Sequence, residues 1–166
     1  MANEAGQGCA DRGSTLTGYT MVSQSAASVS GSVTKLSCYV DFTGGAGALK
    51  FRFYTVDGDT CTPVDGTLVS VTPAQTAGCQ EFEAGVDFTA FDVEAGQYLG
   101  CYVEQKQTYA DAGGTGFWYK NGDYSEAPFV GDDSADDYLD GMSADISAAG
   151  GSVVPIIATI QRRRRG

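Results

Sequence analysis

Two stretches in the first third of the chain alternate strictly between apolar and polar side chains, and no other sequence feature limits the fold as much. They cover residues 35–42 and 49–55. The apolar positions are Leu36, Cys38, Val40 and Phe42 in the first stretch and Leu49, Phe51 and Phe53 in the second. Because successive side chains of an extended strand point to opposite faces, this pattern predicts two half-buried β-strands. The Gly-rich interval 43–48 predicts a turn, and we expect the two strands to pair as a hairpin.

Shorter runs of the same kind recur along the chain, separated by glycine, proline and aspartate. Strands are predicted over residues 15–22, 66–72, 80–91, 117–120 and 139–146 and in the second half of 92–104. In the last of these, Leu99, Cys101 and Val103 are expected to face the core, while Gly100 predicts a bulge or the close approach of another backbone. Many short strands, 23 Gly and no helical periodicity predict an all-β fold. We expect an antiparallel β-sandwich, with the jelly roll as one candidate topology.

The length of the chain, 166 residues, suits one domain with its own hydrophobic core. We assign residues 15–149 to the β-sandwich. Residues 1–14 are polar and Gly-rich, and we expect a flexible or extended N-terminal arm there. The interval 148–152 is typical of a linker, and the composition changes after it. Residues 150–166 are therefore assigned to a C-terminal assembly tail.

The charge of the chain is strongly negative and unevenly distributed. The formal net charge is −11, from 10 Lys and Arg against 21 Asp and Glu. Four of the ten cations are the consecutive Arg162, Arg163, Arg164 and Arg165, and without them the net charge is −15. Such a body repels nucleic acid and anionic membranes, so we expect neither as a partner of the acidic body. The first residues lack the basic start and apolar run of a secretory signal, and we expect a chain used without secretion or one whose signal has been removed.

The residue types present also restrict the chemistry. The chain has no His, which excludes Ser-His-Asp and Cys-His arrangements, and it has no Gly-x-Ser-x-Gly motif. The five Cys include no Cys-x-x-Cys pair, so a common structural zinc site is not expected. Because five is odd, at least one Cys stays unpaired or bonds to another chain, and buried thiols are the simplest interpretation. We expect a protein that is not an enzyme; a glycosidase using two carboxylates among Asp123, Glu126, Asp132 and Asp136 is the catalytic alternative.

An Asp-rich stretch late in the chain is the candidate metal site. It contains Asp132, Asp133, Asp136 and Asp137. Crowded carboxylates lose their mutual repulsion when they bind a hard cation, so calcium is the one ion that we consider. The spacing does not match an EF-hand loop, and a solvated acidic loop is the alternative interpretation. No other cofactor is expected.

Aromatic residues gather in the same half of the chain and define a candidate glycan site. Its residues are Tyr109, Trp118, Tyr119 and Tyr124. Exposed aromatic rings beside Asp and Asn are a common way to hold sugars. On strands, however, at least half of such rings must face the core.

The C-terminal tail is the candidate partner-binding element. Its apolar residues are Val153, Val154, Ile156, Ile157 and Ile160, and the four Arg follow directly. An exposed apolar segment with high strand propensity is prone to aggregation, so we expect other residues to pack against it. The tail is either the last edge strand of its own sheet or a strand that adds to a neighbouring subunit, with the Arg side chains paired to acidic surface there.

The chain resembles a class of viral proteins at two places. These are the run Val93-Glu-Ala-Gly-Gln-Tyr-Leu-Gly100 and the run Gly116-Phe-Trp-Tyr-Lys-Asn-Gly-Asp123. They are similar to β-sandwich domains of virion-associated proteins of tailed bacteriophages, such as fibres, head decorations and adhesins. The resemblance implies a structural or host-attachment role on a virion, made in the host cytoplasm without a signal peptide. It assigns no functional residue.

Taken together, these observations predict a non-enzymatic structural protein of a viral particle or surface assembly, either a capsid decoration, a fibre or a tail component. Its expected partners are further copies of itself, other virion proteins, or both. The alternative is an extracellular or cell-surface module for carbohydrate binding or adhesion, whose partner is a surface glycan.

Overall fold

The described part of the chain forms fourteen β-strands connected by loops. The computed structural model describes residues 3–41, 47–110, 112–132, 134–135 and 139–149, which contain no α-helix. The strands are β1 (Asn3–Gly6), β2 (Ser14–Ala26), β3 (Gly31–Asp41), β4 (Leu49–Asp57), β5 (Thr60–Pro63), β6 (Val69–Val71), β7 (Gly78–Glu83), β8 (Asp92–Val93), β9 (Tyr98–Ala110), β10 (Phe117–Asn121), β11 (Phe129–Val130), β12 (Ser134–Ala135), β13 (Leu139–Asp140) and β14 (Met142–Ala148). The predicted all-β class is confirmed.

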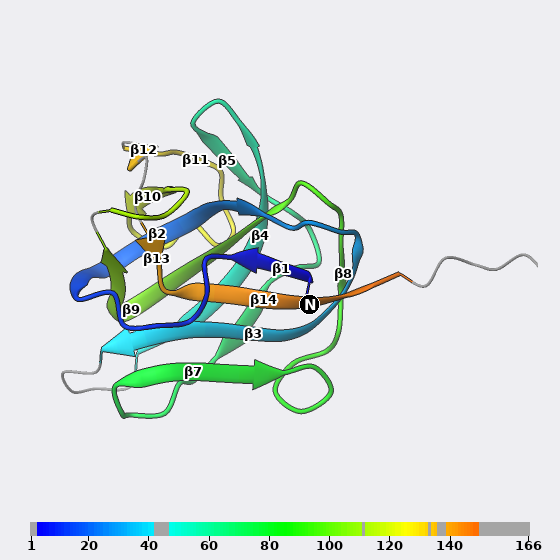
Figure 1. Cartoon of the computed structure of the whole chain (residues 1–166), viewed down its shortest axis with the longest axis horizontal. Helices are drawn as coiled ribbons and strands as arrows, with labels where there is room; N and C mark the ends of the chain where they lie inside the picture. The colour runs from blue at the N-terminus through cyan, green and yellow to red at the C-terminus, as the bar shows by residue number, and fades with distance from the viewer. Residues whose placement is uncertain (1–2, 42–46, 111, 133, 136–138, 150–166) are drawn as a thin grey trace, which may run out of the picture.

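The strands form two layers that pack face to face (Figure 1). One layer has the order β1-β14-β3-β7, with β8 beside the start of β3. The other has β4, β9, β2 and β10, extended by β5 and β6 beside β4 and by β12 beside β10. The end of β3 also pairs with β9, which joins the layers along one side and brings the sandwich close to a barrel. All strand pairs are antiparallel, which confirms the predicted sandwich without establishing jelly-roll connections.

The predicted hairpin between residues 35–42 and 49–55 is wrong, although both strands exist as β3 and β4. Neither pairs with the other in the part of the chain that the structure describes. Both instead pair with the 13-residue strand β9, β4 through Leu49 opposite Val103 and β3 through Val40 opposite Gln107. The alternation of side chains determines which face of a strand is buried but does not specify the neighbouring strand. A long strand elsewhere in the chain could therefore pair with both β3 and β4.

The main core lies between the layers and has the side chains that the alternation predicted. Leu36, Cys38 and Val40 are buried, as are the core-facing residues predicted in β9. The largest fully buried side chains of this core are Met21, Leu36, Leu49, Phe51, Phe53, Leu99, Phe117 and Met142. Phe42, the last predicted member, lies outside the described residues.

A second, smaller core lies on the outer face of the β4-β9-β2-β10 layer. It is closed by residues 121–132, which we call the covering segment. Its buried members are Val22, Tyr54, Cys61, Trp118 and Phe129. The layer is therefore buried on both faces, and β4 is not the half-buried strand predicted.

Gly100 of β9 is required by this second core. A Cβ atom at this position would lie 2.4 Å from Cε2 of Tyr54 and 2.9 Å from Cγ2 of Val22. The close approach predicted at Gly100 therefore exists, but it involves two side chains and not another backbone. Only glycine leaves room for the Tyr54 ring on this strand.

The strand predicted across residues 80–91 ends earlier, at Glu83. The N–H of Glu83 donates to Oδ2 of Asp87 at 2.8 Å, and the N–H of Asp87 donates to the Glu83 carbonyl at 2.9 Å. Gly85 has a φ of +82°, the left-handed conformation that glycine favours. Residues 84–91, which we call the 84–91 loop, thus form a tight turn where local hydrogen bonds replace strand pairing.

The N-terminal segment, predicted as an arm, is extended at its start and fastened to the sandwich. β1 pairs with β14 at the edge of the first layer. Cys9 forms a disulfide with Cys79 of β7, with the Cα atoms 5.8 Å apart. Cys38, Cys61 and Cys101 are buried thiols, in keeping with the odd number of Cys.

Candidate functional site

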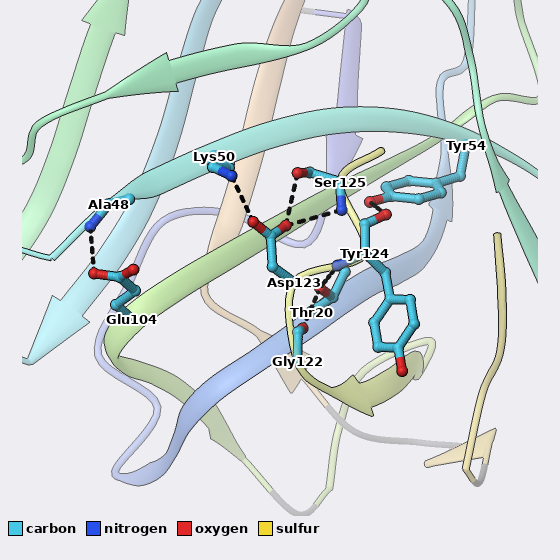
Figure 2. A network of polar contacts seen from close by, with 9 residues as sticks. All are labelled: Thr20, Ala48, Lys50, Tyr54, Glu104, Gly122, Asp123, Tyr124 and Ser125. Carbon is cyan, nitrogen blue, oxygen red and sulfur yellow. Dashed lines mark hydrogen bonds and ion pairs between the residues drawn. The ribbon is translucent and has the colours of Figure 1, made fainter. Parts of the chain in front are cut away.

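A network of polar contacts lies where the covering segment meets the outer face of β4 (Figure 2). Nζ of Lys50 lies 2.5 Å from Oδ2 of Asp123, and the hydroxyl and N–H of Ser125 donate to Oδ1 of the same carboxylate at 2.6 and 3.0 Å. Burial favours the neutral acid, but the hydrogen bonds from Lys50 and Ser125 outweigh it and lower the pKa of Asp123. The carboxylate is therefore ionised and held by three donors.

Two side chains of the sheet hold the backbone of the covering segment next to this ion pair. The hydroxyl of Thr20 donates to the Gly122 carbonyl at 2.8 Å and accepts from the N–H of Tyr124 at 2.9 Å. The hydroxyl of Tyr54 donates to the Tyr124 carbonyl at 3.0 Å (Figure 2). Burial raises the pKa of Tyr54, so its hydroxyl stays protonated and remains a donor.

Further contacts fasten the other end of the covering segment. Nε1 of Trp118 donates to Oδ1 of Asp59 at 3.3 Å, and the Asp59 carbonyl accepts from the N–H of Gly131 at 2.9 Å. Lys120 forms an ion pair with Asp132. Each of these polar groups has its partner within the chain, so the arrangement acts as a clamp that keeps the second core closed.

The structure places one of the four predicted calcium ligands. Asp132 is paired with Lys120, and Asp133, Asp136 and Asp137 lie outside the described residues. No group of three or more Cys, Asp or Glu in the described part of the chain is placed to share a metal ion. Of the alternative carboxylate set for glycoside cleavage, Asp123 and Asp132 are each bound to a lysine.

The aromatic residues proposed for glycan binding do not share one surface. Trp118 is 9% exposed and packs in the second core, with its ring centroid 5.3 Å from that of Tyr98. Tyr119, the next residue of β10, packs on the main core against Phe117. Tyr124 is partly buried in the covering segment, and the side chain of Tyr109 is not among those described.

A second polar network, which the sequence did not reveal, surrounds the fully buried carboxylate of Asp140. Oδ1 accepts from the N–H groups of Met142 at 3.1 Å and Gln7 at 3.3 Å, and Oδ2 accepts from Nε2 of Gln7 at 2.8 Å. The same Gln7 amide donates to the Gly116 carbonyl at 3.0 Å and accepts from the N–H of Thr115 at 2.9 Å. Burial raises the pKa of Asp140 although these hydrogen bonds favour its charged form. One glutamine thus links the N-terminal segment, the 112–116 loop and β13.

Asp140→Asn is expected to lower the free energy of unfolding by about 1 to 3 kcal/mol. The new amide must point a donor at Nε2 of Gln7, because the Gln7 amide cannot flip without losing its bond from Thr115. Urea unfolding followed by circular dichroism measures the change. Asp145→Asn on β14 is the matched control, since its partly exposed pair with Lys35 is worth less than about 1 kcal/mol. Equal losses in the two variants would contradict the role of the buried network.

The residues predicted for partner binding are Val153, Val154, Ile156, Ile157, Ile160, Arg162, Arg163, Arg164 and Arg165, and all lie outside the described residues. The structure does describe the point from which they extend. β14 ends with Ala148 opposite Gly31, and the N–H of Ala149 donates to the Ser30 carbonyl at 3.1 Å. In Figure 1 this end of β14 points out of the sandwich, on the side where β8 lies.

Few large apolar side chains are exposed on the described surface. Two large apolar side chains are exposed on it, Val86 at 78% and Val130 at 58%. Two shallow hollows, of about 560 and 340 Å³, lie beside the 84–91 loop. No helix in the described ranges has the length and apolar character needed to cross a membrane.

Comparison with known proteins identifies no relative. The chain matches no protein-family model, no curated protein and no solved structure.

Proposed function

We propose that the protein is a non-enzymatic structural component of a viral particle or a comparable surface assembly, and that residues 153–165 make its assembly contacts. The observation that carries this proposal is the contrast between the two parts of the chain. Residues before the four Arg have a net charge of −15, and the tail combines a β-prone apolar strip with four consecutive cations. Each part is the electrostatic complement of the other, so copies of the same chain can attract one another through it.

The character of the described surface supports the same assignment of the contacts. A sandwich with only two exposed large apolar side chains in its described part has little apolar surface with which to associate. The apolar strip of the tail offers more, in a form that adds readily to a sheet or a groove. Assembly through the tail accounts for the small exposed apolar surface of the body and for the apolar strip of the tail.

The kind of assembly follows from the resemblance to virion-associated sandwich domains of tailed bacteriophages. A capsid decoration, a fibre or a tail component would use a small, clamped, acidic body exposed to solvent and a separate segment that docks on a neighbour. Such a protein would be made in the host cytoplasm and act on the virion.

The deciding experiment compares the full chain with a version that ends at Gly151. We expect a defined oligomer or filament from the full chain and a monomer from the truncated one, in light scattering on size-separated protein at low and high salt. High salt should weaken association because the Arg contribution is screened. Circular dichroism and thermal unfolding check that the truncated body keeps its fold. Monomers of both chains at every salt concentration would overturn assembly through the tail and direct attention to glycan binding or to docking on another protein.

A further inference from the structure

The 84–91 loop and its neighbours form a surface suited to binding a segment of another chain, which we call the acceptor surface. The larger hollow is lined by residues 84–90, and the smaller one by residues 66, 68–70 and 87–91. Residues 87–90 line both hollows. A bound chain segment that contacts these residues would therefore lie next to both hollows.

The loop is firmly held, although it projects from the sandwich. The rings of Phe88 and Phe91 lie 6.0 Å apart and pack against the main core, and the side chain of Asp87 binds the backbone of Glu83. Val86, between these anchors, is the most exposed large apolar side chain described. A rigid loop that presents an apolar side chain loses little entropy when a partner covers it.

The segment that contains the loop carries negative charge only, and Lys35, which lies opposite Glu83 on β3, is already paired with Glu81 and Asp145. Residues 83–94 include Glu83, Asp87, Asp92 and Glu94 and contain no Lys or Arg. Glu83, Asp87 and Glu94 have exposed side chains and form no ion pair with any other described residue. A cationic segment would find several carboxylates within a short distance here.

β14, the strand that precedes the C-terminal tail, ends at the same end of the sandwich as this loop. Ala148 lies opposite Gly31, Gly31 lies opposite Val93 on its other side, and Val33 donates its N–H to the Phe91 carbonyl. Neighbouring strands are about 4.8 Å apart, so the chain leaves β14 about 10 Å from the end of the 84–91 loop. The end of β14 and the 84–91 loop therefore lie close together at one end of the molecule.

We propose that residues 153–165 of a second copy dock on the 84–91 loop, with the apolar residues at Val86 and the larger hollow and the Arg side chains on the surrounding carboxylates. This inference rests on the proposed assembly function and names its acceptor surface. When two copies meet end to end about a twofold axis, the end of β14 in each copy lies beside the 84–91 loop of the other. Both tails can then be exchanged within one closed dimer. The outward direction of β14 at its end favours exchange over folding back onto the same copy (Figure 1).

The test uses the full chain and a single exposed side chain. Val86→Lys is expected to weaken dimerisation at least about tenfold in sedimentation equilibrium, because it removes apolar contact and adds a charge that repels the Arg run. Val130→Lys is the matched control, since Val130 is also exposed but lies on β11, and it should dimerise like the unmodified chain. Neither change removes a buried contact, so both variants should fold.

A second pair of variants tests the charges. Glu83→Lys combined with Glu94→Lys should weaken dimerisation by a similar factor and reduce its dependence on salt. Asp57→Lys combined with Glu126→Lys changes the net charge equally at exposed positions outside residues 83–94 and should have a smaller effect.

The outcomes separate this inference from the function on which it rests. If truncation at Gly151 abolishes association and the loop variants leave it intact, the tail assembles elsewhere and the acceptor proposed here is wrong. Dimers that survive truncation, or a full chain that is monomeric at every concentration, would overturn both proposals. A monomer whose Val86 resonances change on truncation would show docking within one copy and refute the exchange.

Discussion

Replacing Cys9 and Cys79 together by serine is expected to lower the free energy of unfolding by about 4 kcal/mol and the Tm by roughly 10 °C. The disulfide joins residues 70 positions apart and so closes a long loop in the unfolded chain. Opening that loop raises the entropy of the unfolded state, which is the main source of the expected loss. The effect is large because the bond also ties the N-terminal segment to β7, across two intervening strands of the first layer.

Thermal unfolding with and without dithiothreitol measures this effect. The reductant should lower the Tm of the unmodified protein towards that of the double variant and should leave the variant unchanged. Titration of thiols in denaturant without reductant should find three per chain, since two of the five Cys are bonded. Five thiols in protein purified under oxidising conditions, or an unchanged Tm in the variant, would refute the bond.

Trp118→Ala is expected to cost about 3 to 5 kcal/mol of stability. Trp118 is the largest side chain of the second core, where its ring lies against that of Tyr98. Gly131 approaches it so closely that a Cβ atom at this glycine would lie 3.2 Å from the Trp118 side chain. Removal of the indole leaves a cavity that the clamped covering segment cannot fill. Urea unfolding followed by circular dichroism measures the loss.

Trp118→Phe is the matched control for this variant. It keeps most of the apolar contact and loses the hydrogen bond to Asp59, so we expect a cost near 1 kcal/mol. The same pair of variants decides the role of the aromatic residues. Unchanged stability of Trp118→Ala, combined with loss of binding on a glycan array, would make Trp118 part of a sugar platform and favour the adhesion alternative.

The main strands and their core-facing residues were predictable because the signal is local. Leu36, Cys38 and Val40, and likewise the alternate residues of β9, are buried as their period of two requires. Strand partners were not predictable in this way. β3 and β4 are close in sequence, yet both use β9, because hydrogen bonding between strands depends on which backbones come together in space.

The features of the candidate sites likewise divide into those that the local sequence shows and those that depend on contacts between distant residues. The composition break after residue 149, the Arg run and the acidity of the body are properties of the sequence, and they carry the proposed function. The pairing of Cys9 with Cys79 and the bond between Gln7 and Asp140 join residues 70 and 133 positions apart, and no local pattern marks them. The aromatic cluster shows the difference most clearly, since the sequence contains the rings but cannot say what covers them.

The sequence by itself determined an all-β chain, the buried face of its main strands and a charge contrast between body and tail. These follow from side-chain type, spacing and charge, which need no knowledge of distant contacts. Only the tertiary structure decided that the covering segment buries Trp118, that Gln7 binds Asp140, and that the 84–91 loop and the carboxylates that flank it lie near the end of β14. Each of these depends on segments far apart in the chain meeting in space, where packing and the pairing of buried polar groups select one arrangement from many that the local sequence allows.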